Sequence, residues 1–266
     1  GANAKRLTSV PQADSAPAWT PDGRILFRST RDRWSNFYRM DADGSNLVQL
    51  SSTATDKGAP VLSPDGRWIA FVAHAATSNS QIYVLPAAGG SAVDVTSALS
   101  KNQKFFPSWS PDSRRLAYVE AKSGGLNVRA IDPDGGHPVN ITDDTAVNAS
   151  PVWSPDGKRL AFVSNRDGTG LDRARGDIFV MNADGSGAVN LSRDPNENNY
   201  PAWAADGQAV YFVSLRDGTA QLYTVPALGG ASRRLTQNKG NDLMIRPQAL
   251  AEPKLGLAAL VPTFTK

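Results

Sequence analysis

Apolar and polar positions repeat along the chain in a short unit that is clearest at residues 150–164. A short extended segment there leads into a turn at Pro155-Asp156-Gly157, and an apolar run follows from Leu160 to Ser164. Two strands joined by a tight turn predict a β-hairpin. A second hairpin is expected over residues 177–192, with its turn at Asn182-Ala183-Asp184-Gly185. One unit therefore predicts four antiparallel strands.

Copies of this unit fill the chain, and their turn aspartates are Asp22, Asp65, Asp112, Asp156 and Asp206. A period of about 40 to 50 residues with four strands per unit is typical of propeller blades. A degenerate sixth copy is recognisable at residues 246–250, with Glu252 in the place of the aspartate. We therefore expect an all-β fold, a six-bladed β-propeller with four-stranded antiparallel blades, forming a single domain over residues 1–266.

The N-terminal segment Lys5-Arg6-Leu7-Thr8 matches the end of a unit, as seen at Arg233-Arg234-Leu235-Thr236. A fourth strand at the start of the chain has no first three strands before it. We expect this N-terminal strand to join the C-terminal blade and close the propeller, because closure removes two open sheet edges.

These residues resemble the TolB-type propeller repeat, whose Pro-x-Trp-Ser-Pro-Asp-Gly motif is followed by an apolar strand and a Ser-x-Arg-Asp-Gly motif. The second motif stands here as Ser164-Asn165-Arg166-Asp167-Gly168 and Ser214-Leu215-Arg216-Asp217-Gly218. The resemblance covers nearly the whole chain and implies a propeller fold. The same repeat occurs in periplasmic TolB, in the propellers that precede prolyl-oligopeptidase-type domains and in some polysaccharide lyases. The α/β domain of TolB and a hydrolase domain have no counterpart in this sequence.

Composition narrows the chemistry. The 28 Lys and Arg residues against 25 Asp and Glu residues give a net charge of +3, too balanced to favour a nucleic-acid partner. No apolar stretch approaches the roughly 18 residues of a membrane span, and no leader segment is recognisable. Without cysteine, and with only His74 and His137, neither a metal cluster nor a Ser-His-Asp triad is indicated. We therefore expect no catalytic residue, metal or cofactor.

Four tryptophans share one position of the repeat, directly before the turn, and Leu62 fills that position in the second unit. The tryptophans are Trp19, Trp109, Trp153 and Trp203. A residue that recurs at one structural position is expected to pack between neighbouring blades rather than to bind a ligand.

The loops before each first strand and between the second and third strands should emerge on one face, and they vary from unit to unit. Variation on a fixed scaffold is expected where binding is individualised. Candidate binding residues on this face are Asp14, Arg31, Trp34, Lys57, His74, Lys104, Phe105, Asn148, Arg166, Tyr200, Arg216 and Arg246. The pairs Arg166-Asp167 and Arg216-Asp217 fit local salt bridges and turns equally well.

The pattern favours a non-catalytic, monomeric propeller that binds a protein or peptide at this variable face, in the periplasm or outside the cell. The resemblance to TolB implies a lipoprotein of the cell envelope as the partner. Two alternatives stay open. One is a propeller that binds or degrades polysaccharide, and the other is a sensor or scaffold domain of a larger chain.

Overall fold

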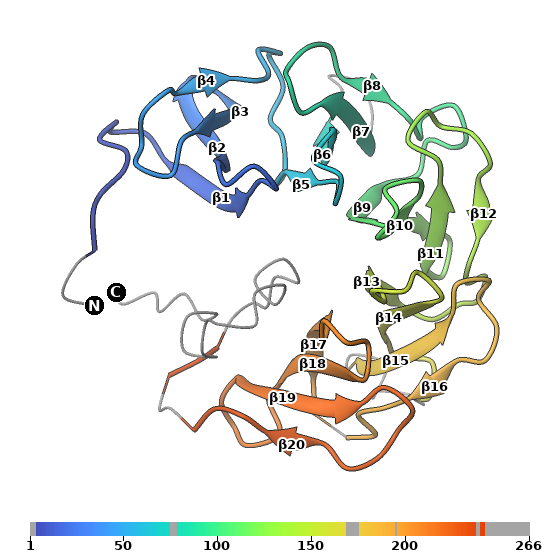
Figure 1. The fold of residues 1–266 in the computed structure, drawn as a ribbon. Helices are drawn as coiled ribbons and strands as arrows, with labels where there is room; N and C mark the ends of the chain where they lie inside the picture. Colours follow the sequence, from blue (N-terminus) through green and yellow to red (C-terminus); the bar gives the residue numbers. More distant parts are fainter. Residues whose placement is uncertain (1–3, 75–78, 169–175, 195, 238–239, 243–266) are drawn as a thin grey trace. The chain divides into compact units, whose positions relative to one another are not determined.

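The computed structural model describes residues 4–74, 79–168, 176–194, 196–237 and 240–242. These residues form five four-stranded antiparallel sheets, which we call blades 1 to 5 in chain order (Figure 1). No helix of the described residues is long and apolar enough to cross a membrane. Residue contacts divide the chain into two compact units, one of residues 1–116 with 132–137 and the other of residues 117–131 with 138–266. That both form a single domain stays a prediction.

In every blade the strands follow one another in the sheet in chain order. Blade 1 comprises β1 (Asp14–Trp19), β2 (Ile25–Asp32), β3 (Trp34–Met40) and β4 (Val48–Gln49). Blade 2 comprises β5 (Val61–Leu62), β6 (Trp68–His74), β7 (Ser80–Pro86) and β8 (Val93–Asp94). Blade 3 comprises β9 (Lys104–Trp109), β10 (Leu116–Lys122), β11 (Gly125–Ile131) and β12 (Val139–Asn140).

Blades 4 and 5 repeat this order in the second unit. Blade 4 comprises β13 (Asn148–Trp153), β14 (Arg159–Ser164), β15 (Asp177–Asn182) and β16 (Val189–Asn190). Blade 5 comprises β17 (Asn198–Trp203), β18 (Ala209–Ser214), β19 (Gln221–Pro226) and β20 (Arg233–Arg234). The four-stranded antiparallel blade predicted from the hydrophobic pattern is thus confirmed.

The predicted count of six blades is wrong, because the structure shows five. The degenerate copy at residues 246–261 lies outside the described residues. The predicted N-terminal strand is also wrong, since residues 4–13 carry no strand. Leu7 instead packs its side chain against the buried residues Ile25, Phe27, Tyr38 and Met40 of blade 1.

Packing explains why this N-terminal segment looks like the end of a unit. A Cβ on Gly44, in the β3–β4 turn, would lie 3.1 Å from the Leu7 carbonyl oxygen. The corresponding glycine of blade 2, Gly89, lies in the same way against Leu50, which directly follows β4. Leu7 therefore occupies the place that a preceding blade's closing residue takes elsewhere, and this contact needs a matching sequence but no strand pairing.

A hydroxyl two residues after each fourth strand joins that end of the chain to the third strand. It accepts a hydrogen bond from a third-strand N–H at 2.9–3.0 Å and donates one to the side-chain oxygen of the residue before that N–H. The hydroxyls belong to Ser51, Thr96, Thr142, Ser192 and Thr236, and their acceptors are Asn36, Gln81, Asn127, Asp177 and Gln221. This linkage explains the closing Leu-Thr or Leu-Ser of the repeat.

The repeated tryptophan packs between blades as expected in two clear cases. Trp109 is 6% exposed and donates from Nε1 to the Val61 carbonyl oxygen at 2.9 Å, and Trp203 is 4% exposed and donates to Val152 at 3.1 Å. Both acceptors lie in the first strand of the preceding blade. Trp19 differs, at 60% exposure, because no blade precedes it within the described residues.

Candidate binding surface

A strained bulge marks the first strand of four blades, at the residue directly before the repeated proline. The residues Ala16, Phe106, Ser150 and Tyr200 all have φ between 51° and 55°. In blades 1, 4 and 5 the register between the first and second strands shifts at this place, as a β-bulge requires. Left-handed backbone at a residue other than glycine has a conformational cost and is concentrated at functional sites.

The bulge turns two large aromatic side chains toward solvent. Phe106 is 50% exposed in the first unit, and Tyr200 is 42% exposed in the second. The ring centroid of the half-buried Phe105 lies 6.2 Å from that of Phe106, so the two rings form a tilted pair. An exposed aromatic held on a strand by a rigid backbone keeps little rotational freedom to lose on binding.

Further apolar side chains are exposed at the loop ends of the blades. In the second unit they are Val147, just before β13, and Leu215, just after β18, with 41% and 38% exposure. The Leu215 N–H donates to the Glu197 carbonyl oxygen at 3.1 Å, which ties its loop to the segment that leads into β17. In the first unit Leu99 is 38% exposed. We call these residues the loop-edge residues: Leu99 and Phe106 in the first unit, and Val147, Tyr200 and Leu215 in the second.

Three of the arginines predicted to bind a ligand instead make their contacts within their own blades. Each guanidinium carbon lies 4.5–5.5 Å from the centroids of two stacked or tilted rings, and each Nε donates to a serine hydroxyl of the same strand end at 2.9–3.1 Å. Each also donates from Nη2 to a predicted or equivalent polar residue before the proline. The pairs are Arg31 with Asp14, Arg166 with Asn148 and Arg216 with Asn198. The structure therefore brings these residues together as internal clamps.

The same position before the proline holds a buried lysine in blades 2 and 3. Lys57, 2% exposed, donates from Nζ to the carbonyl oxygens of Ser35, Thr53 and Thr55 and to Asn36 Oδ1, at 2.9–3.1 Å. Burial lowers the pKa of Lys57 from its ordinary 10.5 to about 8. Lys104 is fully buried and donates to Ser100 and Asn102. These ammonium groups fasten the connection between blades and have no surface for a ligand.

The remaining predicted residues are dispersed. Trp34 begins β3, is half-buried, and has the Arg33 guanidinium 5.6 Å from its ring. His74 ends β6 opposite Ser80. Arg246 lies outside the described residues. A binding role for the predicted residues stays a prediction, and exposure singles out Tyr200 among those whose side chains the structure describes.

Sequence reasoning missed Val147, Leu215 and the bulge itself. The proline that follows the variable residue in every unit did not indicate the bulge, because proline favours extended backbone at the residue before it. Ala59, before Pro60 in blade 2, has no positive φ. Exposure of Val147 and Leu215 depends on loop paths that the repeat does not determine.

At the opposite ends of the blades, the turn aspartates accept hydrogen bonds from groups of their own turns. Asp112 and Asp156 each accept a serine hydroxyl at 2.5–2.6 Å and a backbone N–H at 3.1 Å. The serine hydrogen bond is the main cause that holds the pKa of each carboxyl below its usual range. In the part of the chain that the structure describes, no group of three or more His, Cys, Asp and Glu side chains could hold a metal.

Comparison with known proteins places this geometry in a family. The sequence profile of the TolB beta propeller domain matches residues 1–105, 41–171 and 107–254. A Chlorobaculum tepidum protein named as a TolB homologue is 29% identical over 112 residues, which are 42% of this chain and 25% of that protein. The chain spans half or less of the length of the curated relatives it matches.

Solved structures show the same fold at lower identity. An Agrobacterium tumefaciens structure assigned to TolB has a TM-score of 0.70 and 24% identity, covering 86% of this chain and 83% of its own. An oligogalacturonate lyase in complex with manganese has a TM-score of 0.69 and 18% identity, covering 87% and 68% respectively. At these identities the likeness concerns the fold alone.

Proposed function

Because the chain belongs to the TolB beta propeller domain family, we propose that it is a non-catalytic binding protein of the cell envelope that holds a peptide segment of a protein partner on the loop-edge residues of the second unit, Val147, Tyr200 and Leu215. The resemblance to TolB supports the periplasm as its location and an envelope lipoprotein as its partner. The observation that carries the proposal is the exposed aromatic Tyr200, raised from the first strand of blade 5 by a strained bulge.

Aromatic side chains contribute disproportionately to protein recognition, because they bury a large area at little entropic cost. Tyr200 also has a polar tip, and Val147 and Leu215 supply apolar surface at the same ends of blades 4 and 5. Around Tyr200, Glu197 and Asn199 add polar groups, linked by a hydrogen bond from Asn199 Nδ2 to Glu197 Oε1 at 2.6 Å. An apolar centre with a polar rim is the common arrangement of a protein interface.

Selection from a random peptide library displayed on phage tests the proposal, followed by affinity measurement with the selected peptides. Tyr200→Ser should weaken binding at least about tenfold, since loss of a central aromatic costs more than about 1.4 kcal/mol. Leu228→Ser is the matched control, because Leu228 is 88% exposed in the β19–β20 turn, away from the loop ends. It should leave affinity unchanged.

Equal affinity of the selected peptides for the wild type and Tyr200→Ser would refute the surface, and loss of binding in Leu228→Ser would move the site to the turns. The same assay includes acidic oligosaccharides, with and without divalent metal. The likeness to the lyase raises the polysaccharide alternative, but no described side chain supports it. Saturable oligosaccharide binding would overturn the proposal in favour of that alternative.

A further inference from the structure

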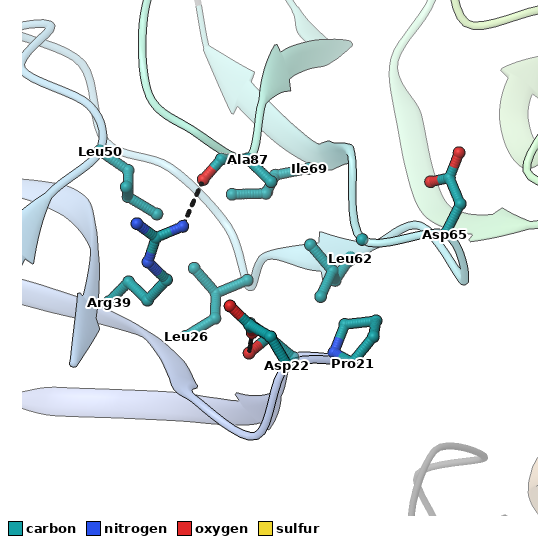
Figure 2. Close-up of a pocket in the computed structure, with 11 residues that line it drawn as sticks. Pro21, Asp22, Leu26, Arg39, Leu50, Leu62, Asp65, Ile69 and Ala87 are labelled. Atoms are coloured by element: carbon teal, nitrogen blue, oxygen red, sulfur yellow. Dashed lines mark hydrogen bonds between the residues drawn. The ribbon is translucent and has the colours of Figure 1, made fainter. Parts of the chain in front are cut away.

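A pocket of about 220 Å³ lies between blades 1 and 2, entirely within the first unit (Figure 2). Its wall is apolar, formed by Leu26, Leu50, Leu62, Ile69 and Ala87, and Arg39 enters from the side of β3. Pro21, Asp22 and Asp65 line its mouth and are exposed, so the pocket opens to solvent beside the Asp-Gly turns.

The second unit shows what normally fills this place. Strand pairing makes Ala161 and Val180 the counterparts of Leu26 and Arg39. The pair Leu26–Arg39 lies three residues along the ladder from the pair Ser29–Asn36, and the pair Ala161–Val180 lies three residues from the equivalent pair Ser164–Asp177. In blades 4 and 5 these positions form one buried cluster with Leu191, Trp203, Val210 and Ala227. The indole of Trp203 thus occupies the volume that remains open between blades 1 and 2.

The junction between blades 3 and 4 agrees with this pattern. Trp153 packs there against Ala117, Ala130, Ile141 and Leu160, which hold the corresponding positions. Three replacements therefore distinguish the junction of blades 1 and 2, and one of them is Leu26 in the place of Ala117 and Ala161. Leu62 stands where the other junctions have tryptophan, and Arg39 stands where they have valine or alanine.

Arg39 places a guanidinium at a position that holds valine or alanine at the other junctions, whereas at the junction of blades 4 and 5 the guanidinium over Trp203 comes from Arg159, a residue of the second strand. Its Nη1 donates to the Ala87 carbonyl oxygen at 3.4 Å (Figure 2). The two carboxylates at the mouth already have arginine partners, since Arg24 lies 3.4 Å from Asp22 and Arg67 lies 2.9 Å from Asp65. The Arg39 guanidinium also attracts the Asp22 carboxylate, so an incoming anion would pair with Arg39 in competition with Asp22.

Size and shape point to the ligand. An apolar cavity of about 150 Å³ is enough to bind benzene, so a cavity of 220 Å³ has room for a larger ring system. The same fold places an indole at the equivalent position elsewhere in this chain, against walls of the same kind. A carboxylate next to the ring would complete the match by pairing with Arg39.

We propose that the pocket between blades 1 and 2 binds the C-terminal tryptophan of a peptide, with the indole against Leu62 and the terminal carboxylate on Arg39. The site does not depend on the loop-edge residues, so it stands or falls separately from the proposed function. Blade-to-blade packing supplies the indole site, and the arginine supplies the preference for a chain end.

Binding of N-acetyl-tryptophan and of its neutral amide, followed by NMR titration of the folded chain, tests the site. The acid should bind saturably and about tenfold more tightly than the amide, because only the acid can form a charge-assisted pair with Arg39. A short peptide that ends in tryptophan should bind at least as tightly as N-acetyl-tryptophan, and the same peptide with an amidated C-terminus should bind more weakly.

Two variants separate the ring from the charge. Leu62→Trp restores the residue of the other junctions, fills the pocket, and should abolish binding of both probes. Arg39→Val restores the residue of blade 4 and should keep indole binding while removing the preference for the acid. Val93→Ala, at an exposed residue of β8, is the control and should bind like the wild type.

Several results would overturn the proposal: no saturable binding of N-acetyl-tryptophan, equal affinity for acid and amide, or an acid preference that survives in Arg39→Val. Tighter binding of free indole-3-acetate than of the peptide would assign the pocket to a small molecule instead of a chain end. If Leu62→Trp does not fold, Arg39→Val still decides the role of the charge.

Discussion

Replacement of Lys57 by methionine probes the fastening of blade 1 to blade 2. The ammonium group of Lys57 is buried and donates four hydrogen bonds, two to oxygens of β3 and two to carbonyl oxygens of the segment before β5. Burial lowers the pKa of Lys57 to about 8, and the nearby Asp56 opposes the shift. Lys57→Met removes the titration while keeping a side chain of similar length.

The sign of the pH effect follows from linkage. Because the pKa of Lys57 is about 8 in the folded chain and 10.5 ordinarily, the unfolded chain binds more protons between these values. Stability of the wild type therefore rises with pH in this window relative to Lys57→Met. The whole effect is roughly 3 kcal/mol, and about 2 kcal/mol of it should appear between pH 7 and pH 9.5.

Urea unfolding at 25 °C, followed by tryptophan fluorescence, measures the difference between wild type and Lys57→Met at several pH values. Tyrosines such as Tyr38, whose pKa is raised by burial, titrate in both proteins and cancel in the difference. Lys158→Met, at an exposed turn residue, shows the effect of losing a surface charge. A difference between wild type and Lys57→Met that stays constant from pH 7 to pH 9.5 would refute the reasoning.

Three further predictions concern stability and use urea unfolding as the measurement. Thr96→Val should cost about 1–3 kcal/mol, because it removes the buried hydroxyl that serves Ile82 N–H and Gln81 Oε1; Thr53→Val, at an exposed hydroxyl, should cost much less. Trp203→Leu should cost about 2–4 kcal/mol by opening a cavity, whereas Trp19→Leu at the same repeat position should cost under about 1 kcal/mol since Trp19 is 60% exposed. Ser154→Ala should shift acid unfolding to higher pH, because the Ser154 hydrogen bond holds the pKa of Asp156 low. The stability that this hydrogen bond contributes is present above the ordinary pKa of the carboxyl and is lost as pH falls through the lower pKa of the folded chain. A difference in unfolding free energy between variant and wild type that persists unchanged at pH 2 would contradict this.

The blade was predictable because its signals are local. Apolar alternation, the Pro-Asp-Gly turn and the second turn glycine specify two hairpins without reference to the rest of the chain. The number of blades was not predictable in this way. The match of Lys5 to Thr8 with a closing strand reflected the packing of Leu7 against blade 1, and sequence similarity does not distinguish a residue that packs from one that pairs.

The candidate surface was harder to predict than the fold. Arg31, Arg166 and Arg216 have the composition of binding residues, yet their guanidinium groups stack on the rings of their own blades. Arginines and aromatic residues occur both in binding interfaces and in contacts between strands of one blade. Residue type alone therefore could not distinguish a binding residue from a structural one. Exposure decides between them, and it depends on loop geometry that the hydrophobic pattern does not specify.

The internal repeat also supplies a standard by which departures can be judged. Leu62 in place of tryptophan would be an ordinary core substitution if its neighbours had closed over the space. Leu26 is indeed larger than its counterparts Ala117 and Ala161, and still about 220 Å³ stays open. Well-packed interiors rarely keep such a space. The departure at blades 1 and 2 therefore has the physical character of a site, whereas the tryptophans that obey the repeat have the character of a core.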